Sequence, residues 1–80
     1  MKEGQIKVKV GPGMFSSERS VVLNVGEKCY NLIVDKQDVK SSMLTVYVVA
    51  DTGDRGLIVD LPRETFTGES RIRIPRTALV

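Results

Sequence analysis

Hydrophobic and polar residues alternate with a period of two along most of the chain, while no segment keeps a helical period over three turns. The clearest examples are residues 6–10 (IKVKV) and residues 71–74 (RIRI). In each, aliphatic side chains occupy every second position and basic side chains the positions between them. This pattern is typical of a strand with one buried and one solvated face, and it predicts strands at both places.

Four further strands are predicted at residues 21–25, 28–34, 43–50 and 57–61. The first two are separated by only Gly26 and Glu27, which indicates a hairpin. Residues 43–50 form the most apolar segment and predict a central strand buried on both sides.

Short connecting segments separate these strands. Asp35 is expected to cap a single helical turn over residues 36–38. Residues 51–56 (DTGDRG) combine Asp and Gly as turns do. Residues 63–69 predict a loop or irregular strand anchored by Phe66, and the end of the chain predicts one 3₁₀ turn with Leu79 folding back.

Six strand segments in 80 residues predict one small all-β domain, residues 1–80. We expect a small SH3-like barrel or a compact β-sandwich of five to six antiparallel strands, with at most one short helical turn. A chain of this length has no room for a deep cleft between two lobes, where many enzymes build their active sites.

The last fifteen residues resemble the ending of SH3-like barrels. Gly68-Glu69-Ser70 provides a turn, Arg71-Ile72-Arg73-Ile74-Pro75 a strand and the start of a 3₁₀ turn, and Leu79-Val80 a hydrophobic end. The resemblance implies the barrel fold alone. The aromatic cluster that binds proline-rich peptides in eukaryotic SH3 domains has no counterpart here, because the chain holds two tyrosines, two phenylalanines and no tryptophan.

Composition argues against catalysis. The chain has no histidine, which removes the commonest general base and the commonest metal ligand. A single cysteine excludes an internal disulfide. We therefore expect a non-enzymatic protein without a cofactor or bound metal. The sequence shows no apolar segment long enough for a membrane helix and no secretory signal, so we expect a cytoplasmic protein that does not bind membranes.

Three smaller features have simpler explanations than a functional site. Cys29 beside a lysine could be a reactive thiol, but without histidine a half-buried strand residue is favoured. Asp51, Asp54 and Asp60 lack the alternating oxygen ligands of a calcium loop, and turn residues are favoured. The glycines of residues 11–13 lack the lysine and hydroxyl residue of a phosphate-binding loop.

The candidate site is a basic face. Lys7 and Lys9 share the outer face of the first strand, Arg71 and Arg73 that of the last, and Arg76 follows closely. The net charge is only +2, so the site depends on the two terminal strands lying side by side. The alternative is an ordinary solvated face neutralised by Glu3, Glu64 and Glu69.

Two functions remain open. The first is a binding module that mediates protein–protein interaction or self-association, with an exposed terminal strand accepting another strand. The second is weak binding of nucleic acid through the five basic residues, which would weaken steeply with salt.

Overall fold

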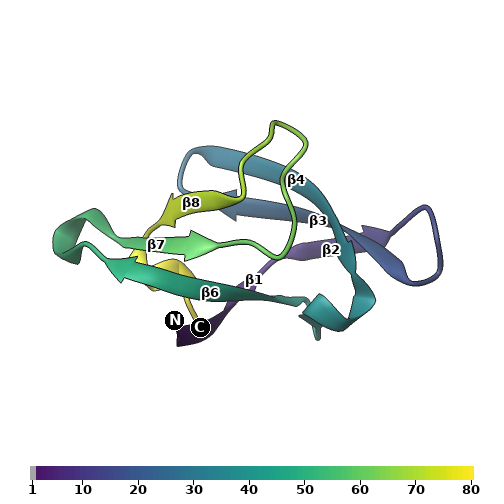
Figure 1. The fold of residues 1–80 in the computed structure, drawn as a ribbon, viewed down its shortest axis with the longest axis horizontal. Coiled ribbons are helices and arrows are strands. Elements are labelled where there is room, and N and C mark those ends of the chain that lie inside the picture. Colours follow the sequence, from purple (N-terminus) through teal and green to yellow (C-terminus); the bar gives the residue numbers. More distant parts are fainter. Residues whose placement is uncertain (1) are drawn as a thin grey trace.

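The computed structural model describes residues 2–80 and shows an all-β protein whose helical segments, in that range, are all 3₁₀ turns. Figure 1 shows the strands in sequence colours. The strands are β1 (Lys2–Lys7), β2 (Lys9–Pro12), β3 (Glu18–Val25), β4 (Lys28–Asp35), β5 (Val39–Lys40), β6 (Met43–Asp51), β7 (Leu57–Asp60) and β8 (Arg71–Ile74). The 3₁₀ turns are η1 (Lys36–Asp38), η2 (Gly53–Arg55) and η3 (Arg76–Ala78).

The strands form two antiparallel sheets. The larger has the order β1-β6-β7-β8, with β5 also paired to β6, and the smaller has the order β2-β3-β4. The predicted all-β class with antiparallel strands is therefore confirmed. Within residues 2–80 strand pairing does not close the two sheets into a barrel, and there are eight strands where five to six were expected.

One extra strand arises because the predicted strand at residues 6–10 is divided. The chain leaves the larger sheet at Val8, whose backbone N–H donates to the Ser42 carbonyl at 2.9 Å, and continues in the smaller sheet as β2. Ile6 and Val8 are buried as predicted, but Val10 is 39% exposed. The alternation of buried and exposed side chains that ends β1 does not continue through β2. The chain changes sheet at Val8, and β2 lies at the edge of the smaller sheet, where Val10 is exposed.

The predicted hairpin is confirmed as β3 and β4, whose register joins Val25 to Lys28 across a two-residue turn. Gly26 in this turn has φ +61°, a left-handed conformation that glycine adopts without steric cost. The hairpin places Leu23 and Leu32 completely inside the protein.

β6 is central in its sheet, as predicted, since it pairs with β1, β5 and β7. The prediction that it is buried on both sides is wrong. Leu44 and Val46 are fully buried on one face, whereas Tyr47 on the other is 42% exposed. The core shared with the smaller sheet lies on the inner face, so Tyr47 is left outside it.

The core lies between the two sheets and consists of fifteen buried aliphatic and aromatic residues. They are Ile6, Val8, Val21, Leu23, Val25, Tyr30, Leu32, Val34, Leu44, Val46, Leu57, Val59, Leu61, Ile72 and Ile74. In the described residues, no helix has the length and apolar character that crossing a membrane requires.

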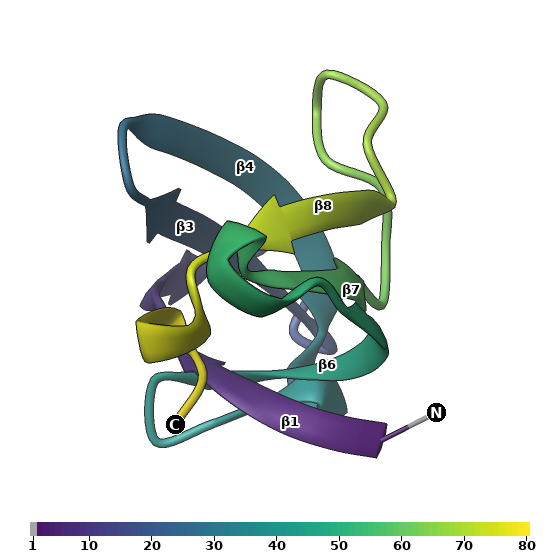
Figure 2. The same ribbon diagram turned by 90° about the vertical axis from the view of Figure 1, so that its left-hand side faces the viewer.

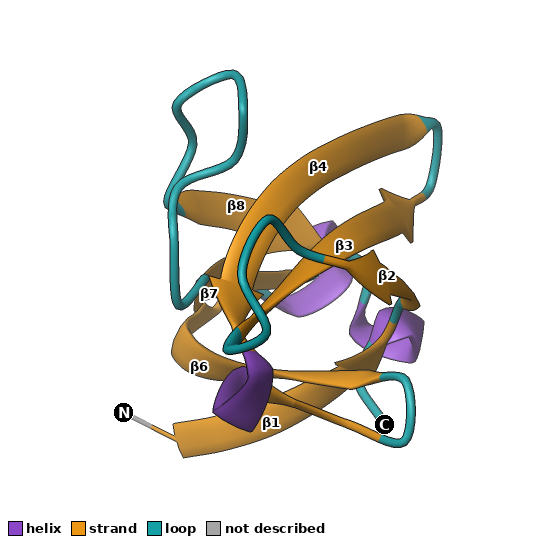
Figure 3. Cartoon of the chain, turned by 90° about the vertical axis from the view of Figure 1, so that its right-hand side faces the viewer, coloured by secondary structure: helices purple, strands orange, loops and turns teal. Residues whose placement is uncertain are grey.

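The loop between β7 and β8 projects beyond both sheets (Figure 3). Here the expectation that Phe66 is an inward anchor is wrong: Thr65 is 5% exposed and Phe66 71% exposed. The Phe66 N–H donates to the Asn31 carbonyl of β4 at 2.7 Å, and Thr65 forms a bridge with Leu32. Because neighbouring side chains alternate along an extended chain, burying Thr65 directs Phe66 outward.

The 3₁₀ turns lie close to where the sequence predicts them, although three are present where at most one was expected. The Asp35 carboxylate accepts the backbone N–H of Gln37 at 2.9 Å and so caps η1. Leu79 folds back after η3, as expected, and there it bridges Ile6 of β1.

Candidate functional site

The two basic terminal strands do not lie side by side. β6 and β7 separate β1 from β8 in the larger sheet, a distance of three strand spacings or roughly 14 Å. The predicted basic face required β1 and β8 to be neighbours, and in the larger sheet they are not. Nucleic-acid binding by these residues stays a prediction, without a single continuous basic face to support it.

The two lysines belong to different sheets, because Lys7 ends β1 and Lys9 begins β2. They border a shallow hollow of about 230 Å³ together with Val8, Val22 and Asn24. The structure thus keeps the lysines close to each other and brings none of the three arginines into this hollow.

Arg71 is paired with an acid on the neighbouring strand. The register of β7 and β8 places it opposite Asp60, and its Nε and Nη2 donate to the two carboxylate oxygens at 2.6 and 3.1 Å. These hydrogen bonds, with the attraction of the charges, lower the pKa of Asp60 and raise that of Arg71. The partner is thus Asp60, and none of the three glutamates expected from the sequence.

Arg76 forms the second ion pair, with Asp51 at the end of β6. Arg76 Nη1 donates to Asp51 Oδ2 at 3.0 Å, and Nη2 donates to Asp51 Oδ1 and, at 3.3 Å, to the Gly53 carbonyl. The hydrogen bonds from Arg76 lower the pKa of Asp51. Arg76 therefore joins η3 to the turn at residues 51–56.

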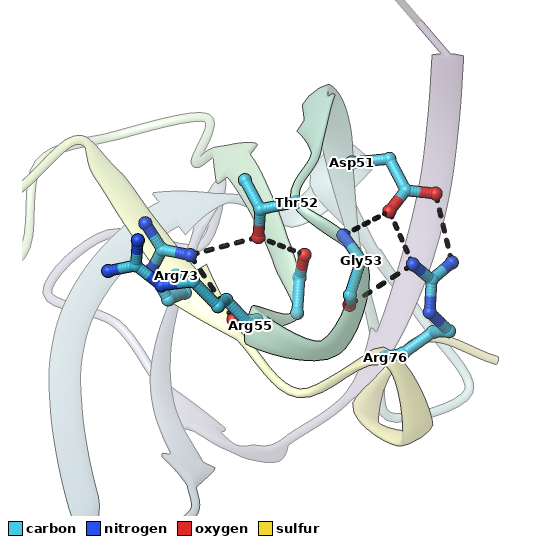
Figure 4. Close-up of polar contacts among 7 residues, drawn as sticks. Asp51, Thr52, Gly53, Arg55, Arg73 and Arg76 are labelled. Carbon is cyan, nitrogen blue, oxygen red and sulfur yellow. Dashed lines mark hydrogen bonds and ion pairs between the residues drawn. The ribbon is translucent and has the colours of Figure 1, made fainter.

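Arg73 joins β8 to the other side of the same turn (Figure 4). Its Nη1 donates to Thr52 Oγ1 at 2.9 Å and to the Arg55 carbonyl at 3.2 Å. The Thr52 hydroxyl donates in turn to the Gly56 carbonyl at 2.5 Å. One nitrogen of Arg73 thus fixes the guanidinium, while its Nε and Nη2 make no hydrogen bond within residues 2–80.

The turn, the end of β8 and η3 meet at one end of the molecule, as Figure 2 shows. They enclose an open cleft of about 470 Å³ lined by residues 53–56 and 73–77, here called the arginine cleft. It contains Arg73 and Arg76 from the predicted set and adds Arg55, which the sequence analysis missed. Arg55 lies in residues 51–56, which the sequence predicts to be a turn because of their Asp and Gly residues. Nothing in that pattern indicates that Arg55 belongs to a binding site.

Glu69 is engaged within its own loop. Its carboxylate accepts hydrogen bonds from the hydroxyls of Thr65 and Thr67, which lower its pKa, and neither of the two ion pairs among residues 2–80 involves it. Cys29 is exposed, contrary to the expected half-buried position. Among the described residues no group of three or more His, Cys, Asp or Glu could hold a metal ion.

Two loops present large apolar side chains to solvent. Met14 and Phe15, between β2 and β3, are 87% and 65% exposed, and Phe66 is exposed in the loop after β7. The backbone fixes both loops: Glu18 N–H donates to the Phe15 carbonyl at 3.0 Å, and Phe66 is bonded to β4. No pattern in the sequence indicated that Met14 and Phe15 are exposed, because neither lies in a predicted strand.

Sheet edges differ in how far they are covered. The Ile6–Leu79 bridge and a hydrogen bond from Val80 N–H to the Gln5 carbonyl at 2.8 Å cover part of β1. The loop after β7 covers the middle of β4. β2 contains Pro12, which lacks an N–H donor.

β8 keeps an open edge and is the outermost strand of its sheet in Figure 1. The Ser70 carbonyl accepts the Leu61 N–H at 2.8 Å, on the side of β7. Because backbone groups alternate in direction along an antiparallel strand, those of Arg71 and Arg73 point away from β7. No strand within residues 2–80 pairs with β8 on that side.

Taken together, the fold and site define an all-β protein whose two antiparallel sheets stay unclosed within residues 2–80, with an open edge at β8 and an arginine-lined cleft. No model of a known protein family matches the chain. Searches among curated proteins and among solved structures likewise find no significant similarity.

Proposed function

We propose that this protein is a non-catalytic module that binds another protein by accepting an extended segment on the open edge of β8. The observation that carries the proposal is the row of outward N–H and C=O groups at Arg71 and Arg73, which no strand of the described chain pairs. Backbone hydrogen bonds to such an edge supply affinity, and the flanking side chains supply selectivity.

The side chains beside this edge favour a selective partner. Arg71 and Arg73 are both exposed, and charged residues on an edge strand oppose indiscriminate association of sheets. Arg71 is already paired with Asp60, but Arg73 retains unused donors. An acidic extended segment would therefore match this edge better than an apolar or basic one.

The exposed side chains of Met14, Phe15 and Phe66 also support a role in protein binding. Aromatic residues and methionine are enriched at protein interfaces, where they contribute large apolar area. Each of these residues stands on a loop whose backbone is fixed by hydrogen bonds, so little ordering is needed when a partner binds.

We also propose that the arrangement is an SH3-like barrel left open beside β8. Its support is the ending of the chain: a strand at Arg71–Ile74, a 3₁₀ turn at Arg76–Ala78 and a fold-back of Leu79, the order that the resemblance implies. The unclosed pairing is what leaves the strand edge accessible.

Selection from a library of displayed random peptides tests the binding proposal. Arg71→Pro removes one outward N–H at the first residue of an edge strand, a position where proline fits the fold. We expect selected peptides to bind Arg71→Pro about tenfold or more weakly than wild type, since an interface hydrogen bond is lost and the ring obstructs pairing.

Arg71→Gln is the matched control, because it also loses the ion pair with Asp60 but keeps the backbone N–H. It should retain binding within about threefold. Equal affinity of the peptides for wild type and Arg71→Pro, or no enriched peptide, would overturn the proposal. A dimer mass in light scattering that Arg71→Pro reduces to a monomer mass would identify the occupant as a second copy of the chain.

A further inference from the structure

Ligand binding at the arginine cleft does not require strand addition to β8. We infer that Arg55 and Arg73 form a binding site for an oxyanion, such as a phosphate or carboxylate group, at the mouth of this cleft. The cleft lies at the end of the molecule formed by η2 and η3.

Arg73 is oriented before any ligand arrives. Its Nη1 is held by Thr52 Oγ1 and the Arg55 carbonyl, while Nε and Nη2 have no acceptor among residues 2–80. A guanidinium fixed through one nitrogen can present two parallel N–H donors to an oxyanion with little loss of side-chain freedom.

Arg55 supplies the second positive charge. Its guanidinium is exposed and makes no hydrogen bond or ion pair within residues 2–80. Figure 4 shows the side chains of Arg55 and Arg73 on the same side of the turn. Two like charges held near one another repel, and an anion between them converts that repulsion into attraction.

The other charged groups of the cleft leave this pair available. Arg76 is committed to Asp51, so these two charges largely cancel. Asp54 lines the cleft and opposes an anion, but it forms no ion pair with either arginine. Two arginines against one aspartate leave a local excess of positive charge, and Thr77 adds a hydroxyl to the same lining.

NMR titration of the ¹⁵N-labelled protein with sodium phosphate, and separately with sodium acetate, tests the site at constant ionic strength maintained with NaCl. We expect saturable shifts confined to the amides of residues 53–56 and 73–77, with a roughly millimolar Kd. The salt that saturates these signals at the lower concentration identifies the bound group as phosphate or carboxylate.

Arg55→Gln should weaken binding about three- to fivefold, as expected for loss of one exposed charge contact. The variant should fold normally, because the Arg55 guanidinium supports no other residue. Arg63→Gln, which removes an exposed arginine outside the cleft, is the charge-matched control and should leave Kd unchanged. Asp54→Asn should tighten binding.

Absence of saturable shifts with both salts would overturn the inference. Equal weakening by Arg55→Gln and Arg63→Gln would overturn it as well, since it would show that only net charge matters. Either result leaves the strand-addition proposal intact, because that proposal rests on the outward backbone groups of β8 and is tested at Arg71, which does not line the cleft.

Discussion

At the scale of single residues, the arginine cleft depends on a glycine. Gly56 has φ +93°, and a Cβ atom there would lie 2.2 Å from the Ile74 carbonyl oxygen. The glycine therefore allows the end of the turn to approach β8 closely, which positions Arg55 and Thr52 for their contacts with Arg73.

Replacement of this glycine should be costly. Gly56→Ala combines a left-handed backbone with a collision against the Ile74 backbone, and we expect it to lower the free energy of unfolding by about 3 kcal/mol or more. Gly53→Ala is the control: its φ is +66°, but no atom lies within 4 Å of the added methyl, so only about 1–2 kcal/mol should be lost. Urea unfolding measures both, and equal losses would contradict the explanation.

At the scale of elements, the loop between β7 and β8 is organised by a network of hydrogen bonds. Thr65 Oγ1 is bonded to the Glu69 carboxylate, accepts the Glu69 N–H at 3.1 Å and lies 3.2 Å from Thr67 Oγ1. The loop also attaches to β4 through Asn31. This network holds Phe66 in its exposed position. Because it includes the Glu69 carboxylate, the stability of the loop should depend on pH.

Acid should loosen this loop. Hydrogen bonds from Thr65 and Thr67 lower the pKa of Glu69, so their stabilising effect is present above the unfolded-state pKa and is lost as the pH falls through the lower folded-state value. We expect the exchange protection of the Phe66 amide to fall below about pH 4.

Thr65→Val keeps the shape of the side chain but removes the hydroxyl whose hydrogen bond lowers the pKa of Glu69 most, so this pKa should rise towards its ordinary value. Carboxyl-carbon NMR titration measures the shift. Ser70→Ala, in the same loop but outside the network, should leave this pKa unchanged. An unaltered Glu69 pKa in Thr65→Val would show that the hydroxyl does not support the carboxylate.

At the scale of the whole molecule, one core joins two sheets that strand pairing leaves unclosed. Leu23 and Leu32 come from the smaller sheet, Leu44 and Val59 from the larger, and all four are completely buried. Neither sheet retains a hydrophobic core once the other is removed. The two sheets should therefore unfold together.

Leu44→Ala should cost about 2–5 kcal/mol, because it opens a cavity at a fully buried position of the central strand. Val10→Ala, at an exposed position of β2, should cost less than about 1 kcal/mol. Amide signals of β4 and β6 followed by NMR in urea should lose intensity with the same midpoint in each protein. Separate midpoints for the two sheets would contradict a shared core.

The sequence by itself determined most of the strand segments, because a period of two is a local property of the chain, but it did not predict residues 2–5 of β1 or the short strand β5. It placed the β3–β4 hairpin correctly, since a two-residue connection leaves only one partner and one register. It also located the Asp35 cap and the turn after β6, whose chemistry lies within a few neighbouring residues.

Apart from that hairpin, only the tertiary structure decided which strands are neighbours and what each side chain meets. The alternation of basic and aliphatic residues at 71–74 predicts that Arg71 faces outward. It does not predict that Asp60 lies opposite Arg71 or that β6 and β7 separate β8 from β1. Those facts follow from the packing of residues distant in sequence around one core. For the same reason Arg55 and Arg73, eighteen positions apart, became neighbours in a cleft.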